Sequence, residues 1–234
     1  MLSAWREPPR LHVAILSETY NFLFLLSPGT GSTSVSRALV DAGVGVWCPQ
    51  EDLQLSPGKE GLVPRKHTTY PHFKRWNLLP RPLAEYQVVT TVRNPFDFWI
   101  SEYLRHRHRW SAHLENPGSH IFTKASDAES VRQAVELEFP EWMRLKWSKF
   151  DDKHAEMLHP RFAAKADYFL RFEELPASFR AWMAERGVPG SIELGHDNVT
   201  SRERDYRPYY DEATRQLLER VYRFYLRRFQ YSFA

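Results

Sequence analysis

Two short segments of this 234-residue chain contain residue types that bind anions. The first, residues 27–34 (SPGTGSTS), joins an apolar run to a helical pattern. Its small residues let the backbone approach a ligand closely, and consecutive N–H groups at a helix N-terminus form a concave anion site. Four hydroxyls add further donors: those of Thr30, Ser32, Thr33 and Ser34. The segment predicts a phosphate-binding loop; the alternative is a tight strand–helix turn with ordinary capping hydroxyls.

The second segment is centred on Arg93, between the β-rich run 86–92 and a helix start at Asn94-Pro95. The guanidinium fork of an arginine suits a phosphate monoester better than a lysine does. Ser101 lies in the second turn of the expected helix, and helical side chains tilt toward the N-terminus. We therefore expect its hydroxyl to reach back toward an anion held by Arg93. The alternative is a structural Arg93 that pairs with Asp97.

The elements that must position these segments follow from apolar runs and helical spacing. Three strands are expected, at residues 21–27, 86–92 and 166–172. Helices are expected at residues 33–42, 94–108, 173–186 and 211–229, with 127–164 mostly helical. Strands that alternate with helices indicate a parallel sheet, whose ligands lie at the carboxyl ends of the strands. We expect an α/β, P-loop-like three-layer fold with a central, mainly parallel sheet flanked by helices.

Length and composition predict one domain over residues 1–234, in which residues 110–165 form a mostly helical elaboration. The net charge of +3 argues against a dedicated nucleic-acid binder. Cys48 is the only cysteine, so no intramolecular disulfide can form. No apolar run approaches the roughly 20 residues of a spanning helix, and residues 1–10 do not resemble a signal peptide. We expect a cytoplasmic protein without an integral membrane segment.

Two other kinds of phosphate or metal site fit the residues poorly. A P-loop kinase needs G-x-x-x-x-G-K-[ST], and no lysine lies between Gly29 and Arg37. The histidine pairs lack helical i,i+4 spacing and nearby cysteines, so we expect no metal site. These pairs are His106/His108 and His154/His159. The basic run 105–109 indicates a solvated helix end, which can also attract an acidic acceptor.

Together these residues resemble the sulfotransferase superfamily. Its members have a phosphosulfate loop after the first strand and a later R-[ND]-P-x-[DE]-x-x-x-S segment. Here the loop is residues 29–34, and residues 93–101 (RNPFDFWIS) match the later segment closely. Residues 170–175 (LRFEEL) are similar to the family's strand-to-helix segment, and residues 194–233 to the tail of its bacterial and carbohydrate-type members. That tail includes Asn198, Thr200, Asp205, Tyr206, Arg207, Tyr209, Tyr210 and Asp211.

The resemblance implies transfer of a sulfonate group from 3′-phosphoadenosine 5′-phosphosulfate (PAPS) to an acceptor hydroxyl or amine. The acceptor is then a carbohydrate or another small molecule, and the other product is 3′-phosphoadenosine 5′-phosphate (PAP). By resemblance the loop binds the 5′-phosphosulfate, and Arg93 with Ser101 binds the 3′-phosphate. The loop residues implied are Gly29, Thr30, Gly31, Ser32, Thr33 and Ser34. The chemistry requires no metal.

Such a transfer needs a general base and a cation for the departing phosphate. His67 is the expected base, because it lies between the two anion-binding segments and resembles the K-H-x-x segment of related enzymes. The chain departs from the family at Gly29, where most members have Lys or Arg. Lys66, Lys74 and Arg75 are the cations expected to compensate. The alternative is a non-catalytic module that binds PAP or another nucleotide without turnover.

Overall fold

The computed structural model describes residues 14–48, 70, 73–74, 78–122, 125–148, 160–195 and 205–234. Its residue contacts divide the chain into two compact units. The sheet unit comprises residues 1–92 and 161–197, and the helical unit comprises residues 93–160 and 198–234. Each unit is described by itself, and one domain over residues 1–234 stays a prediction.

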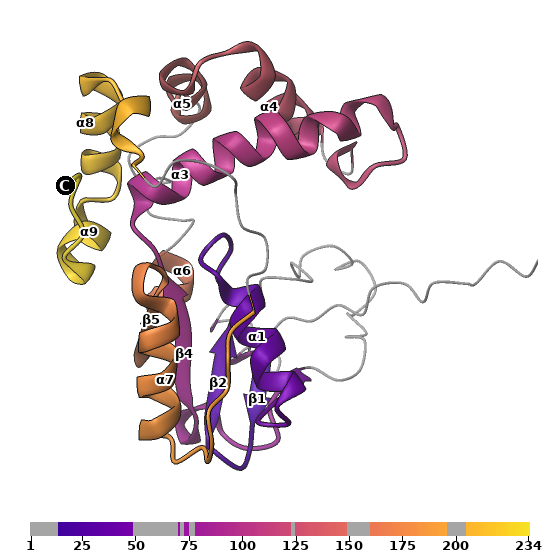
Figure 1. The fold of residues 1–234 in the computed structure, drawn as a ribbon, viewed down its shortest axis with the longest axis vertical. Coiled ribbons are helices and arrows are strands. Elements are labelled where there is room, and N and C mark those ends of the chain that lie inside the picture. Colours follow the sequence, from indigo (N-terminus) through magenta and orange to yellow (C-terminus); the bar gives the residue numbers. More distant parts are fainter. Residues whose placement is uncertain are drawn as a thin grey trace, which may run out of the picture. The chain divides into compact units, whose positions relative to one another are not determined.

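The sheet unit is built on five strands among its described residues (Figure 1). They are β1 (Ala14–Ser17), β2 (Phe22–Leu25), β3 (Val46–Cys48), β4 (Gln87–Val92) and β5 (Tyr168–Arg171). The strand order is β3-β1-β2-β4-β5. β2, β4 and β5 are parallel to one another, whereas β1 pairs antiparallel with both β2 and β3. The fold is α/β, as predicted.

The sheet is mixed, so the prediction of a mainly parallel sheet was wrong for the two strands at one edge, β1 and β3. Its parallel part consists of the three strands that the sequence identified, at residues 21–27, 86–92 and 166–172. The antiparallel part, β1 and β3, was missed. β2 and β5 are equally short, but each leads into a helix, whereas β1 leads into the turn to β2 and β3 has only three residues. β1 joins β2 through a tight turn in which Asn21 adopts a positive φ of 53°.

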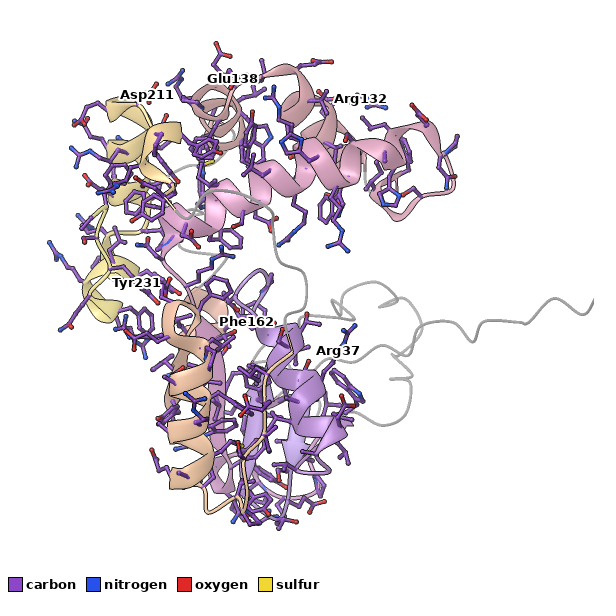
Figure 2. All side chains as sticks on the ribbon, in the orientation of Figure 1. Arg37, Arg132, Glu138, Phe162, Asp211 and Tyr231 are labelled. Carbon is purple, nitrogen blue, oxygen red and sulfur yellow. The ribbon has the colours of Figure 1, made fainter. Side chains whose placement is uncertain are left out.

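Side chains of the strands alternate between two buried faces. On one face, Phe22 and Phe24 pack with α1 (Ser32–Asp41) and α7 (Leu175–Glu185), which Figure 1 shows lying along the strands. The rings of Trp182 and Phe22 pack edge-on, with their centroids 4.8 Å apart. On the other face, Leu23 and Leu25 pack with a cluster that includes Phe162 of α6 (Pro160–Ala163) (Figure 2). The sheet is therefore covered on both sides.

The helical unit contains α3 (Pro95–Leu104), α4 (Ala125–Glu136), α5 (Phe139–Trp147), α8 (Glu212–Val221) and α9 (Arg223–Phe229). A π-helical segment, Arg105–Trp110, continues α3, where the sequence predicted an α-helix to about residue 108. The helix predicted over 211–229 is two helices divided at Tyr222. Tyr222 N donates to Leu218 O at the end of α8, and Tyr222 O accepts from Leu226 N at the start of α9, both at 2.8 Å.

Aromatic side chains form most of the core of the helical unit. Trp99 of α3 packs against Trp142 of α5, with ring centroids 6.2 Å apart, and donates a hydrogen bond of 3.1 Å from Nε1 to the hydroxyl of Tyr222. Tyr103 packs on both Phe139 and Trp142. α3 is thus held along its length by buried rings. None of the helices in the described residues is long and apolar enough to cross a membrane.

Candidate functional site

The backbone of residues 28–31 has the alternating conformation of an anion-binding nest. Gly29 and Gly31 have φ values of 67° and 80°, while Thr30 between them is not among the residues with positive φ. Alternation of this kind turns successive N–H groups toward one concavity. Within the described residues, the N–H groups of Gly31, Ser32 and Thr33 donate to no protein acceptor. They are the orphan donors at the start of α1 and are suited to an anion.

Two of the loop's hydroxyls stabilise the loop itself. Thr30 Oγ1 donates to the carbonyl oxygen of Ser27 at 2.8 Å, and Ser32 Oγ donates to the same oxygen at 2.7 Å. Thr30 also contacts the hydroxyl of Thr91 near the end of β4. Because a hydroxyl has a single hydrogen, Thr91 is the donor in that contact. All three side chains are buried, so this network holds the loop against the carboxyl end of the parallel strands.

The other two hydroxyls make no hydrogen bond to the described residues. They belong to Thr33, which is half-buried, and Ser34, which is buried, both in the first turn of α1. The sequence grouped all four hydroxyls as ligand donors, and the structure separates them into two that shape the loop and two that remain available.

Gly31 is packed tightly against the segment that follows β5. A Cβ at this position would lie 2.6 Å from Cδ2 of Leu175 and 3.1 Å from Cδ2 of Phe172. The loop therefore touches residues 170–175 (LRFEEL), which the sequence analysis had singled out separately. Only glycine meets both the close approach and the positive φ at this position.

A groove of about 490 Å³ lies beside the loop in the sheet unit. α1 lines one side with Ser34, Arg37 (labelled in Figure 2), Ala38, Asp41 and Ala42. The segment after α7 lines the other side with Ser191, Ile192, Glu193 and Gly195. Its volume lies in the range of small-molecule sites. The sequence analysis missed the groove, because nothing in the pattern of residues 191–195 places them beside α1.

In the helical unit, Arg93, which directly precedes the N-cap of α3, forms one buried cluster with Asp97 and Ser101 of that helix. Arg93 Nε donates to Asp97 Oδ2 at 2.6 Å, and Arg93 Nη2 donates to Ser101 Oγ at 2.6 Å. The spacing of four residues places Asp97 and Ser101 on one face of α3. The side chains of Arg93 and Asp97 are 7% and 14% exposed. The pairing of Arg93 with Asp97 is the contact expected of a structural arginine, whereas the binding of an anion by Arg93 and Ser101 stays a prediction.

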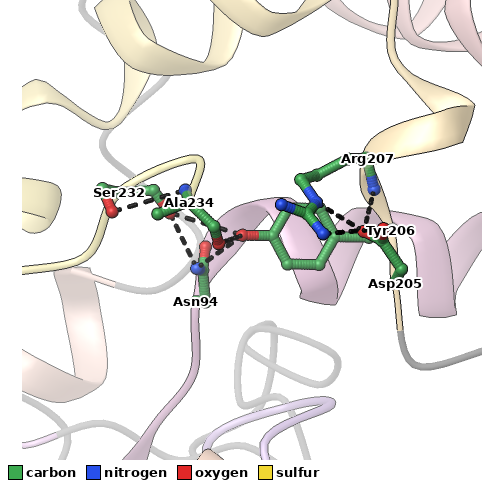
Figure 3. Close-up of polar contacts among 6 residues, drawn as sticks. All are labelled: Asn94, Asp205, Tyr206, Arg207, Ser232 and Ala234. Atoms are coloured by element: carbon green, nitrogen blue, oxygen red, sulfur yellow. Dashed lines mark hydrogen bonds and ion pairs between the residues drawn. The ribbon is translucent and has the colours of Figure 1, made fainter.

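Asn94 joins the start of α3 to the end of the chain (Figure 3). Its Oδ1 caps α3 by accepting from Phe96 N at 3.0 Å. Its Nδ2 donates to the hydroxyl of Tyr206 at 3.3 Å and to the carbonyl oxygen of Ser232 at 3.0 Å. The Tyr206 hydroxyl in turn donates to the carbonyl oxygen of Ala234 at 3.0 Å, and burial raises the pKa of Tyr206. The sequence indicated only the capping role of Asn94.

The last helix also contacts Arg93. The backbone N–H of Arg93 donates to the hydroxyl of Tyr225 in α9, at 3.3 Å. Tyr225 lies on the buried face of α9 with Phe229, and their ring centroids are 4.7 Å apart. α9 therefore supports the residue that begins the second predicted anion-binding segment.

The predicted base and most of the compensating cations lie outside the described residues: His67, Lys66 and Arg75, and also Asn198 and Thr200 of the tail. Lys74 is exposed. His106 is buried, packs against Trp110 and Trp142, and has its pKa lowered by that burial. Its Nδ1 donates to the carbonyl oxygen of Glu102 at 2.7 Å. These contacts make His106 part of the aromatic core.

Comparison with known proteins identifies one family. A family model described as "Sulfotransferase family" matches residues 12–232, nearly the whole chain. No curated protein and no solved structure is significantly similar to the chain. The matched range includes both predicted anion-binding segments and the tail that contacts Asn94 at the start of α3.

Proposed function

The chain belongs to the sulfotransferase family, and from this premise we propose that it moves a sulfonate group from PAPS to a hydroxyl or amine of a carbohydrate or small-molecule acceptor. Family membership establishes a transferase of sulfonate groups. The donor, the acceptor class and the roles of individual residues are our proposal. The observation that carries it is the buried cluster in which one guanidinium contacts both Asp97 and Ser101.

Arg93 and Ser101 bind the 3′-phosphate in this proposal. Asp97 orients the guanidinium by accepting from Nε, and the guanidinium then presents a fixed fork to two of the phosphate oxygens. The Ser101 hydroxyl accepts from Arg93 in the described structure, and its own hydrogen can be donated to an anion. A preorganised pair of this kind loses little side-chain entropy on binding.

The loop of residues 29–34 binds the 5′-phosphosulfate. Its N–H groups and the hydroxyls of Thr33 and Ser34 supply the donors, while Thr30 and Ser32 maintain its shape through Ser27. Amides fixed before the ligand arrives stabilise charge without reorganising, and this is how such loops contribute to catalysis. The groove next to Ser34 receives the adenosine part of the donor, where Asp41 and Glu193 can accept hydrogen bonds from sugar or base.

The transfer itself is an in-line displacement at sulfur. The acceptor oxygen or nitrogen forms a bond to sulfur, the bond from sulfur to the bridging phosphate oxygen breaks, and the acceptor proton passes to His67. The electron pair of the broken bond leaves on PAP. Gly29 provides no cation for that leaving group, so Lys66, Lys74 or Arg75 supplies it.

Calorimetric titration with PAP and with 5′-AMP tests the proposed donor. We expect PAP to bind at least about a hundredfold more tightly, because only PAP has the 3′-phosphate that charge-assisted bonds from Arg93 recognise. The variant R93K should remove most of this preference, whereas R132K, an exposed arginine of α4, should leave it unchanged. Equal affinity of the wild type for PAP and 5′-AMP would refute the assignment.

Gly29 favours a second candidate, a module that binds PAP without turnover. Its φ of 67° disfavours the Lys or Arg that most family members have there. Incubation with radiolabelled PAPS and a library of hydroxyl and amine acceptors separates the two functions. Label transferred to an acceptor, and lost in H67A, supports the enzyme; tight PAP binding with no label transferred from PAPS supports the module.

A further inference from the structure

Four residues from the C-terminal part of the chain contact the start of α3, and we call them the clasp: Tyr206, Ser232, Phe233 and Ala234. The side-chain amide of Asn94 is one of the two groups that they hold (Figure 3). Its Nδ2 donates to the carbonyl oxygen of Ser232 at 3.0 Å and to the hydroxyl of Tyr206 at 3.3 Å. That hydroxyl donates in turn to the carbonyl oxygen of Ala234 at 3.0 Å. A chain of hydrogen bonds therefore joins the N-cap of α3 to the clasp.

The second group that the clasp holds is the ring of Phe96, in the first turn of α3. This ring is buried. It packs edge-on against Phe233, with centroids 5.0 Å apart, and stacks on Tyr206, with centroids 6.2 Å apart. Offset and edge-on arrangements of this kind are the favourable geometries of aromatic pairs. Hydrogen bonds and ring packing thus hold the same short segment, residues 94–96.

The backbone of Arg93 precedes the hydrogen-bond ladder of α3. The carbonyl oxygen of Asn94 accepts the first bond of that ladder, from Phe98 N at 2.9 Å, and Asn94 has the non-helical φ of −54° and ψ of 121° of an N-cap. The N–H of Arg93 donates to the hydroxyl of Tyr225 at 3.3 Å, and the ring of Tyr225 stacks on that of Tyr231, with centroids 6.2 Å apart. Contacts from the C-terminal part of the chain therefore help to set the conformation of Arg93.

We propose that Asn94 and Tyr206 are positioning residues for Arg93, a proposal that rests on the sulfonate-transfer function above and concerns its 3′-phosphate site. The guanidinium of Arg93 contacts Asp97 and Ser101 at 2.6 Å each, and its fork has a defined direction when the backbone that carries it is also fixed. A guanidinium lies about 6 Å from its Cα, so a backbone rotation of about 10° moves the fork by about 1 Å, a displacement that weakens a preorganised site. The clasp opposes that rotation, because it fixes the residue next to Arg93.

The amide of Asn94 makes more bonds than a helix cap requires. Its Oδ1 caps α3 by accepting from Phe96 N at 3.0 Å, and Ser or Asp would cap a helix equally well. Its Nδ2 takes no part in the cap and donates instead to Ser232 and Tyr206 of the clasp. Because both ends of the amide are bonded, its plane has one orientation. A serine at this position would keep the cap and lose the clasp, so the two roles can be separated.

Calorimetry of N94S and Y206F with PAP and 5′-AMP tests the proposal, at a temperature at which circular dichroism shows each variant folded. We expect the Kd for PAP to rise about tenfold in N94S and about threefold in Y206F, which keeps the bond to Ser232. The Kd for 5′-AMP, which lacks the 3′-phosphate, should change less than about twofold. The matched control Y210F loses a hydroxyl that donates to the carbonyl oxygen of Phe96 at 2.8 Å, and should leave both Kd values unchanged. A preference for PAP that persists in N94S and Y206F, or falls equally in Y210F, would overturn the proposal.

The variant R93K shows whether Asn94 acts through Arg93. A lysine at this position lacks the fork whose direction the clasp sets. In the R93K background, N94S should therefore change the Kd for PAP less than about twofold, because contributions of coupled residues are not additive. A full tenfold rise added to that of R93K would mean that Asn94 affects the phosphate by another route, and the positioning role would be wrong.

The Nε–H signal of Arg93 in nuclear magnetic resonance spectra gives a readout that needs no nucleotide. This hydrogen is donated to Asp97, and R93K identifies its signal by removing it. We expect N94S and Y206F to shift the signal and to speed its exchange with water, whereas Y210F should leave both as in the wild type. An unchanged signal in N94S and Y206F would refute the positioning role whatever the nucleotides do. If the signal shifts but the wild type binds PAP and 5′-AMP equally, the clasp positions Arg93 and the proposed function alone falls.

Discussion

The loop of residues 27–34 and the Arg93 cluster both fit an anion, but they are built in opposite ways. In the loop, side chains serve the backbone, because the hydroxyls of Thr30 and Ser32 both donate to Ser27 and leave the N–H groups exposed to a ligand. In the cluster, the backbone N–H of Arg93 donates to the hydroxyl of Tyr225, and the groups that we propose bind a phosphate are the side chains of Arg93 and Ser101. A site made of backbone N–H groups depends on the φ angles of the loop and on the room around it. A site made of side chains depends on how their charges are balanced by neighbouring groups.

This difference predicts that the loop is most sensitive to a change in volume. G31A forces a Cβ to 2.6 Å from Leu175 at a φ of 80°, and we expect unfolding to become easier by about 3 kcal/mol. G43A is the matched control, because Gly43 has a φ of 66° with no atom within 4 Å of its added Cβ; it should cost about 1 kcal/mol. Urea denaturation measures both. Equal costs would mean that the packing against Leu175 is unimportant.

The Arg93 cluster should instead respond to a change in charge at constant volume. D97N leaves the Arg93 guanidinium buried without its carboxylate, and we expect a loss of about 2 kcal/mol in the free energy of unfolding. A bound phosphate replaces the lost charge, so PAP should raise the Tm of D97N more than that of the wild type. Thermal melts with and without PAP measure this. A smaller PAP shift in D97N would mean that the loss of Arg93 orientation outweighs the charge that the phosphate restores.

The smallest expected change in stability distinguishes the hydroxyls that bond within the loop from those that bond none of the described residues. T30V removes a buried hydroxyl that bonds Ser27 and Thr91, and should cost about 1.5 kcal/mol of stability. T33V removes a hydroxyl of the same shape that bonds none of the described residues, and should leave stability within about 0.5 kcal/mol while raising the Kd for PAP several-fold. Urea denaturation measures the stability of both variants, and calorimetry measures their Kd for PAP. Equal losses of stability in T30V and T33V would show that the two kinds of hydroxyl do not differ.

Sequence patterns determined the parallel part of the fold. Each of its strands joins a compact apolar run to a turn or helix signal, as in Phe22–Leu25 before Pro28-Gly29 and Gln87–Val92 before Asn94-Pro95. The hydrophobic period and the turn residues are local properties of the chain, so they can be read without the structure. The same local reasoning placed Ser101 in the second turn of a helix that begins after Arg93, with its side chain tilted back toward Arg93, and the structure has the two side chains hydrogen-bonded.

Contacts between distant residues were decided by tertiary structure alone. The antiparallel strands β1 and β3, the packing of Leu175 on Gly31 and the groove beside Ser34 join segments 30 to more than 150 residues apart. Tertiary structure also decided which of the loop's four hydroxyls bond within the protein and which remain available, because this depends on where Ser27 and Thr91 lie. Sequence shows which groups are able to bind an anion. Only packing determines which of them are already engaged, since a hydroxyl hydrogen donated within the protein cannot be donated to a ligand.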